Sequence, residues 1–228
     1  MEIKRLHDWN VSIDKARVIQ LNLKEKIKLS KLKKRVKLVA GADVSYSKKT
    51  ETCFAAVSVF GFSEMKLIEQ SQAKGVVTFP YITGYLTFRE APILLEAFEK
   101  IINVPDIILF DGQGIAHPRK MGLAAHMGLF FDLPSIGCAK SRLVGDFKDP
   151  ATQAGSRTDL IYKNKRIGAV IRTREDVKPV FVSPGFKITI EEAIDWILKT
   201  CIGYRVPEPI RTSHLKVNRI RAEYENKF

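Results

Sequence analysis

A short apolar strand constrains the fold of this chain more than any other feature. Residues 106–111 (DIILFD) place four consecutive apolar side chains between two aspartates. A strand with one exposed face alternates apolar and polar residues, whereas an unbroken apolar strand must be covered on both faces. The pattern therefore predicts a strand in the middle of a sheet.

The segments before this strand predict helices and an antiparallel meander. Ser12 can cap a helix over residues 13–29, and residues 30–37 (SKLKKRVK) then form a basic connector. Short separations rich in polar residues or Gly, typical of hairpins, divide the next three strand-like stretches, which are 38–43, 53–60 and 66–79. Apolar residues at three- and four-residue steps predict a helix over 88–102.

After the apolar strand, helices and strands alternate. Helices are expected over 121–131, from a capping box at residues 189–192 to about 198, and in the basic tail from 209; strands are expected at 135–139, 166–173 and 179–183. We therefore predict an α/β fold with a mixed sheet, three antiparallel strands followed by parallel strands, flanked by helices. This order is compatible with a ribonuclease H-like fold. Because no repeat or linker interrupts it, residues 1–228 are expected to form one domain.

The net charge of +13 is concentrated at the ends of the chain. Residues 1–40 carry 12 basic and 4 acidic side chains and residues 199–228 carry 7 and 3, while the middle is nearly neutral. Composition leaves two interpretations open, a solvated Lys-rich surface or a surface for a polyanion, since Lys and Arg contacts to phosphate dominate non-specific nucleic-acid affinity.

Hydropathy and cysteine content indicate the cellular compartment in which the protein is expected. No apolar run approaches the ~18 residues of a membrane helix, and the first ten residues are polar, unlike a secretory signal. The three cysteines are far apart and have no metal-ligand spacing. We expect a cytoplasmic protein that does not enter a membrane.

Two aspartates end apolar strands. Asp43 closes LVAGAD and Asp111 closes IILFD. Either could cap a turn, but on neighbouring strands the two carboxylates would meet at one edge and supply oxygen ligands for Mg²⁺. Glu90 also has two interpretations: Thr87-x-x-Glu90 fits a capping box, or the carboxylate is a third metal ligand.

Other polar side chains are more ambiguous. Lys140 ends a small-residue strand, where it is either solvated or stabilises charge on a reacting phosphate. His117 follows the glycine turn after Asp111 and could line the same edge, whereas His214 lies in the basic tail and reaches that edge only if the tail folds back. His126 is expected to pack in the core, and His7 has no partner in view. No Walker A, GxSxG or dinucleotide-binding motif is present, so the sequence gives no support for a nucleotide cofactor or for a nucleophilic serine.

Several motifs resemble the endonuclease V family, in order and over nearly the whole chain. The two longest are PYITGYLTFRE at residues 80–90 and FDGQGIAHPR at 110–119; the others are GADVSY at 41–46, GCAKS at 137–141, VSPG at 182–185 and PEPIRTSH at 207–214. The resemblance implies a ribonuclease H-like, Mg²⁺-dependent endonuclease for deaminated purines, chiefly deoxyinosine in DNA. Such enzymes cut the second phosphodiester bond 3′ to the lesion and leave 3′-OH and 5′-phosphate ends.

The resemblance also implies roles for particular residues. Asp43, Asp111 and Glu90 would bind the metal, which is Mg²⁺ with Mn²⁺ as a substitute, and Lys140 and His214 would assist at the scissile phosphate. A strand-separating wedge would comprise Pro80, Tyr81, Ile82 and Thr83. Thr83 stands where the family typically has a second proline, which predicts a less rigid wedge. Phe186 stands where relatives often have histidine.

A lesion pocket is expected near Gly84, Gly112, Gly114 and His117, where backbone amides could read an extruded base. The expected partner is single- or double-stranded DNA containing deoxyinosine, bound by a monomer. Two alternatives remain open: a related nuclease for inosine-containing RNA or branched DNA, and a non-catalytic nucleic-acid binding protein.

Overall fold

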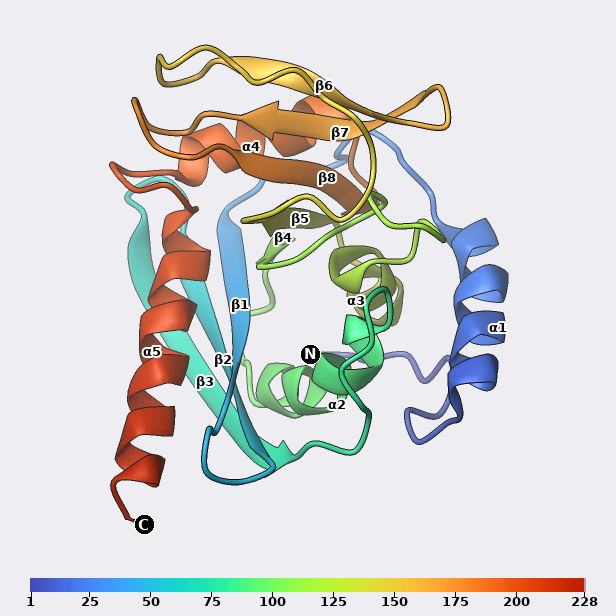
Figure 1. The fold of residues 1–228 in the computed structure, drawn as a ribbon. Coiled ribbons are helices and arrows are strands. Elements are labelled where there is room, and N and C mark those ends of the chain that lie inside the picture. Colours follow the sequence, from blue (N-terminus) through green and yellow to red (C-terminus); the bar gives the residue numbers. More distant parts are fainter. Residues whose placement is uncertain (228) are drawn as a thin grey trace.

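The computed structural model describes residues 1–227, and a single mixed sheet of eight strands runs through it (Figure 1). The strand order is β3-β2-β1-β4-β5-β8-β7-β6. The strands are β1 Leu38–Tyr46, β2 Thr52–Gly61, β3 Lys66–Val76, β4 Ile107–Phe110, β5 Ser135–Ala139, β6 Arg157–Tyr162, β7 Lys165–Ile171 and β8 Val180–Phe186. The helices are α1 Ile13–Leu23, α2 Leu86–Glu99, α3 Leu123–Phe131, α4 Ile190–Thr200 and α5 Glu208–Glu225.

The apolar strand is β4, and it lies in the interior of the sheet as predicted. All four of its residues are fully buried, and it runs parallel to both β1 and β5. Its side chains alternate between two cores: Ile108 and Phe110 pack with α2 and α3, whereas Ile107 and Leu109 pack with α4 and the start of α5. Helices therefore cover both faces, which explains why the strand has no polar residue.

The meander and the parallel strands beside it are confirmed, but the far end of the sheet differs from the prediction. β1, β2 and β3 are antiparallel, and β4 and β5 are parallel to β1. By contrast, β8, β7 and β6 each run antiparallel to their neighbours, so the expectation of parallel strands holds only for β4 and β5. A crossover helix is not needed between strands joined as hairpins.

The first helix and β6 differ most from the prediction, while several other elements are shifted by a few residues. The first helix ends at Leu23, six residues earlier than predicted, and a short 3₁₀ turn at Lys24–Lys26 follows. β6 was not predicted at all, because it is an edge strand with a single buried residue, Leu160, and thus has almost no apolar pattern. The capping box at Thr189 and Glu192 is present as expected.

Helix α5 packs closely against β1 and β2 (Figure 1). The contact depends on Gly41, since a Cβ atom there would lie 2.1 Å from the backbone carbon of Pro209. The Ser213 hydroxyl also donates a hydrogen bond of 2.9 Å to the Gly41 carbonyl oxygen. This close approach carries the basic tail back to the sheet and places His214 beside β1.

Candidate active site

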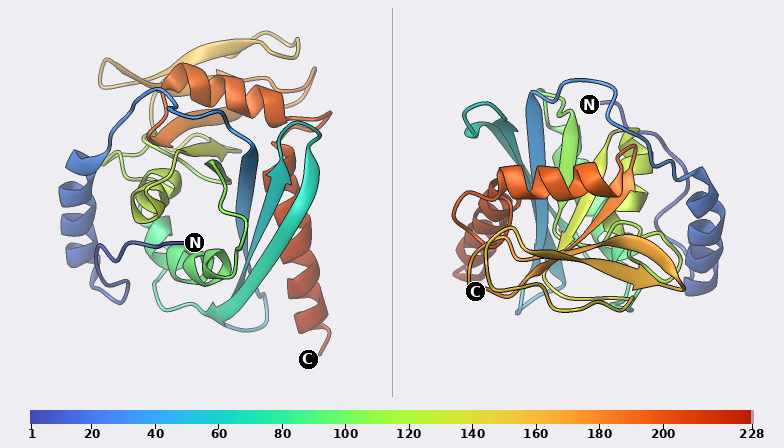
Figure 2. Two further views of the ribbon diagram at one scale, coloured as in Figure 1. Left: turned by 180° about the vertical axis from the view of Figure 1, so that it is seen from behind. Right: turned by 90° about the horizontal axis from the view of Figure 1, so that it is seen from above.

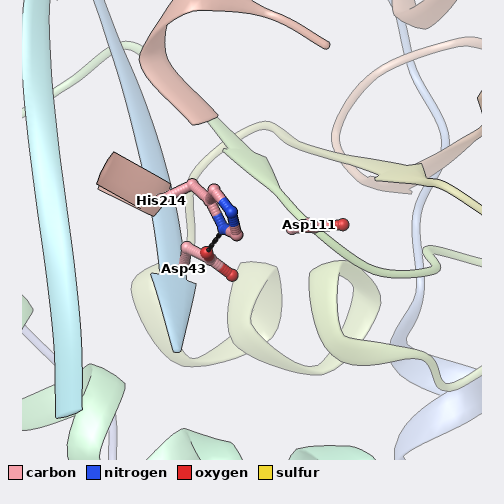
Figure 3. A group of neighbouring side chains, drawn as sticks. All are labelled: Asp43, Asp111 and His214. Atoms are coloured by element: carbon pink, nitrogen blue, oxygen red, sulfur yellow. Dashed lines mark hydrogen bonds and ion pairs between the residues drawn. The ribbon is translucent and has the colours of Figure 1, made fainter. Parts of the chain in front are cut away.

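The two aspartates that follow apolar runs lie side by side, but only Asp111 stands at a strand end, because β1 continues past Asp43 to Tyr46. Ala42 of β1 pairs with Phe110 of β4 in parallel register, so the next residues, Asp43 and Asp111, lie next to each other where β4 ends. One ligand atom each from Asp43, Asp111 and His214 fall within 4.8 Å of one another (Figure 3). The structure therefore brings together three of the side chains that were singled out in the sequence.

His214 reaches this edge from α5. Its Nδ1 lies 2.6 Å from Asp43 Oδ2, and this hydrogen bond raises the pKa of the imidazole (Figure 3). On the other side of the ring, the Asn218 amide nitrogen donates to Nε2 at 3.0 Å, and Asn218 in turn accepts a hydrogen bond from the Ser45 hydroxyl. Asn218 was not found in the sequence, although its spacing of four residues from His214 on a helix is a usable signal.

Glu90 faces the two aspartates and does not cap its helix. The N-cap of α2 is Tyr85, which makes no side-chain cap, so the capping-box interpretation is wrong. Glu90 is 9% exposed and accepts a hydrogen bond of 3.1 Å from the Tyr46 hydroxyl. Burial, with Asp43 adding repulsion, raises the pKa of Glu90 to about 8.

Lys140 is the cation closest to these acids. It follows β5 and forms an ion pair with Asp111. Burial and the neighbouring Asp43 nevertheless raise the pKa of Asp111. Asp43, Glu90 and Asp111 thus lie close together, and burial disfavours the ionised forms of Glu90 and Asp111. Oxygen donors that repel one another in this way fit a divalent cation such as Mg²⁺.

A cavity of ≈ 270 Å³ adjoins the acidic edge. Asp111 and Lys140 form part of its wall, together with Gly84, Gly112 and His117. Gly114 does not line it, which corrects its assignment to the pocket. A Cβ atom on Gly114 would meet the Pro184 carbonyl oxygen at 2.2 Å, so this glycine permits close packing against β8.

The carbonyl oxygen of Gly84 organises the opposite wall. It accepts hydrogen bonds from His117 Nε2 at 2.9 Å, Arg119 Nη2 at 2.8 Å and Gln20 Nε2 at 3.1 Å. Burial lowers the pKa of His117 to about 4, so at neutral pH the ring is uncharged. Gln20 was missed in the sequence, although a glutamine on the apolar face of the first helix could have marked it.

The four residues expected to form a wedge lie on the loop that leads to Gly84. Pro80, Tyr81 and Thr83 are exposed, and the Tyr81 side chain, 74% exposed, stands out most. Ile82 instead is partly buried and packs against the cluster that contains Phe79, Tyr85 and Phe88. The loop is therefore anchored at its base while its tip is free to contact a ligand.

The structure gives packing partners to His7 and Phe186, for which the sequence suggested none. His7, for which no partner was expected, lies 2.7 Å from the Nε2 atom of His126, and His126 is fully buried as predicted. Phe186 packs with Met121 and Leu129 between α1 and α3, so it has a structural role.

The fold and the site together define a class. A ribonuclease H-like sheet that gathers carboxylates where neighbouring strands end, next to a basic side chain and a cavity, is the framework of a phosphodiester-cleaving nuclease.

Comparison with known proteins identifies the family. The Endonuclease V family model matches residues 21–215, and the chain belongs to the Endonuclease V family, whose members are nucleases. Endonuclease V of Dehalococcoides mccartyi is 46% identical over 94% of this chain and 96% of its own length. Endonuclease V of Methanothrix thermoacetophila is also 46% identical, over 94% and 95%.

Solved structures agree with this assignment. The Bacillus subtilis endonuclease V structure superposes with a TM-score of 0.95 at 31% identity, covering 100% of both chains. The Ciona intestinalis endonuclease V structure, at 29% identity and a TM-score of 0.81, covers 93% of this chain and 98% of its own. The Ciona protein was solved with a 24mer DNA containing an inosine followed by a ribo-adenosine. No helix within residues 1–227 has the length and apolarity to cross a membrane.

Proposed function

We propose that this protein is a Mg²⁺-dependent DNA repair endonuclease. It recognises deoxyinosine and cuts the second phosphodiester bond 3′ to it, leaving 3′-OH and 5′-phosphate ends. The observation that carries this proposal is the continuity of three features: the acidic edge, the adjoining cavity and the exposed loop around Tyr81. The inosine-containing DNA bound by the Ciona relative supports the choice of substrate.

Asp43, Asp111 and Glu90 are the proposed metal ligands, and Mn²⁺ is expected to substitute for Mg²⁺. A divalent ion at this edge would activate water and neutralise charge on the leaving oxygen. Lys140, already paired with Asp111, is placed to attract a phosphate oxygen to the same edge. The hydrogen bond with Asp43 and the amide of Asn218 fix the His214 ring for proton handling beside the scissile bond.

The cavity fits the role of a pocket for an extruded base. Gly84, Gly112 and His117 form its wall, and its volume lies near the lower limit for ligand pockets, which suits a single base. Gln113 also lines it, and its Oε1 atom is buried without a hydrogen-bond partner among residues 1–227. A free acceptor would bind the N1–H of hypoxanthine and would meet a lone pair on adenine, which separates the deaminated base from its parent.

Tyr81→Ala is expected to reduce the preference for inosine-containing over undamaged duplex by about tenfold or more. The exposed ring is placed to fill the space that the extruded base leaves in the stack, and stacking is worth about 1–3 kcal/mol per base. The measurement is the ratio of binding constants for the two duplexes. Tyr204→Ala, at another exposed tyrosine outside the cavity, should keep the ratio. An unchanged ratio in Tyr81→Ala would remove Tyr81 from the wedge.

A nicking assay tests the proposal as a whole. The protein is incubated with Mg²⁺ and a duplex carrying one deoxyinosine, with guanine at the same position as the control and EDTA as the metal-free arm. A single product that ends one nucleotide beyond the inosine is expected only with deoxyinosine and Mg²⁺. Equal cutting of both duplexes, or cutting in EDTA, would refute the proposal.

A second candidate substrate is inosine-containing RNA. The ribo-adenosine that follows inosine in the Ciona complex favours including it. Matched DNA and RNA strands of the same base sequence, each with one inosine, would separate the two. If the cleavage rate were at least tenfold higher on the RNA strand, inosine-containing RNA would be the principal substrate in place of deoxyinosine DNA.

A further inference from the structure

The basic connector between α1 and β1 forms an unpaired cationic surface. Within residues 1–227, no ion pair involves any of six neighbouring cations, which we call the connector surface: Lys31, Lys33, Lys34, Arg35, Lys37 and Lys199. The basic C-terminal helix differs, since Arg211, Arg219 and Arg221 all pair with glutamates of the same helix. The connector surface therefore gathers six cations without an ion pair, whereas the arginines of the C-terminal helix are largely compensated.

The connector is held firmly against the body of the protein. The Leu32 amide donates to Glu192 at 3.0 Å, and the amides of Lys37 and Leu38 donate to Asp106 at 2.8 and 2.9 Å. Val36 is buried in the core beneath. The two nearby carboxylates thus bind the main chain, and the cationic side chains between these anchor points are presented outward on a fixed backbone.

A cavity of ≈ 680 Å³ lies in this surface, and Lys34, Arg35, Lys37 and Lys199 surround it without any carboxylate in the wall. Its aromatic residues, Phe62 and Trp196, pack edge to face with ring centroids 4.6 Å apart, and Trp196 is only 9% exposed. Trp196 therefore offers little ring surface for stacking, whereas Phe62 is half-buried. The four cations around the cavity make it suited to phosphate groups.

The connector surface is separate from the candidate active site. It lies where β1 begins, beside α4 (Figure 2, left), whereas Asp43 stands five residues further along the strand, a distance of about 17 Å. None of the residues that line the cavity in the connector surface also lines the cavity beside Asp111.

We propose that the connector surface binds the sugar–phosphate backbone of a second nucleic-acid segment while the active site holds the first. Contact with phosphate alone carries no sequence information, so the second segment need contain no lesion. Such a surface would keep the protein on long or folded DNA during the search for damage. This inference rests on the proposed function only in taking nucleic acid as the partner.

The test measures the binding of a second duplex to a protein whose active site is already occupied by a first duplex. A saturating unlabelled short deoxyinosine duplex is added without divalent metal, so that nothing is cut, and a labelled undamaged duplex is then titrated in. The wild type should bind it with strong salt dependence. K34A/R35A/K37A should bind at least tenfold more weakly and lose up to about 2.7 from the log–log salt slope, or ~0.9 for each lost phosphate contact.

A matched control removes the same charge elsewhere. K148A/K163A/K165A changes three exposed lysines on and beside the β6–β7 hairpin and should retain binding of the second duplex. Both triple variants should unfold at the wild-type temperature, because none of these ammonium or guanidinium groups makes a hydrogen bond or ion pair within residues 1–227.

Several outcomes would overturn the inference. These are failure of the wild type to bind a second duplex, equal weakening in both triple variants, and binding of anionic lipid vesicles in place of duplex. Slower single-turnover nicking of the short deoxyinosine duplex by K34A/R35A/K37A would instead assign the surface to the first DNA segment. Failure of the proposed function would be seen separately, as a wild type that does not nick deoxyinosine.

Discussion

Replacing Asp111 with asparagine is expected to abolish Mg²⁺-dependent nicking of a deoxyinosine duplex while leaving the duplex bound. Asp111 lies at the junction of the acidic edge and the cavity, and it pairs with Lys140. If Asp111 is a metal ligand as proposed, its loss removes several kcal/mol of stabilisation from the reacting phosphate; about 4 kcal/mol corresponds to a rate about 10³-fold lower. The measurement is single-turnover nicking, with binding followed separately.

Unfolding should not explain the loss. Because burial and Asp43 raise the pKa of Asp111, its ionised form is disfavoured in the folded protein, and a neutral asparagine relieves that repulsion. Asp111→Asn should therefore unfold at the wild-type temperature or above it. Asp195→Asn makes the same change at an exposed position on α4 and should keep full activity. Full nicking by Asp111→Asn would remove this carboxylate from the metal site.

Gly41→Ala is expected to lower both stability and activity. The new Cβ atom would lie 2.1–2.4 Å from backbone atoms of Pro209 and Ile210, which cannot move aside as a side chain can. Overpacking of this kind costs about 3 kcal/mol. Helix α5 must also shift by roughly 1 Å or more, which carries His214 away from Asp43 and reduces the nicking rate by about 10²-fold. Denaturant unfolding and single-turnover kinetics measure the two effects.

Gly61→Ala is the matched control. At the end of β2, an added Cβ atom would come closest to the side chain of Ile68, at 3.2 Å, which can rotate, and would make an ordinary contact of 3.9 Å with the Lys66 carbonyl oxygen. Its stability should change by less than about 1 kcal/mol, and its activity should not change. If Gly41→Ala behaved in the same way, α5 would not be docked through this glycine and the placement of His214 would need another cause.

The parts of the fold that the sequence predicted well are those with a strong local pattern. β4 was placed inside the sheet from its apolar run alone, and the capping box of α4 was found from two residues three positions apart. β6 was missed because an edge strand buries too little to leave a pattern. The length of α1 was overestimated because its apolar spacing continues through Ile27, beyond the last helical turn.

The residues of the candidate site also divide into those that a local sequence pattern predicts and those that it does not. Asp43 and Asp111 could be paired in advance, since each follows an apolar run, although β1 continues past Asp43 to Tyr46 and only Asp111 stands at a strand end. Glu90 could not be assigned from spacing, because the same residue spacing fits a helix cap. Only the packing of α2, which turns Glu90 toward Tyr46 and the two aspartates, distinguishes the two roles.

By itself, the sequence determined the central strand, the two aspartates that follow apolar runs on neighbouring strands, and the motifs that mark the family. All three depend on the order of residues along the chain, which needs no knowledge of distant contacts. Only the tertiary structure decided that His214 joins Asp43 across 171 residues, that Gln20 supports Gly84, and that the connector charge lies apart from the active site. These depend on which surfaces pack together, and close approaches such as that of Gly41 to Pro209 leave no periodic signal in the sequence.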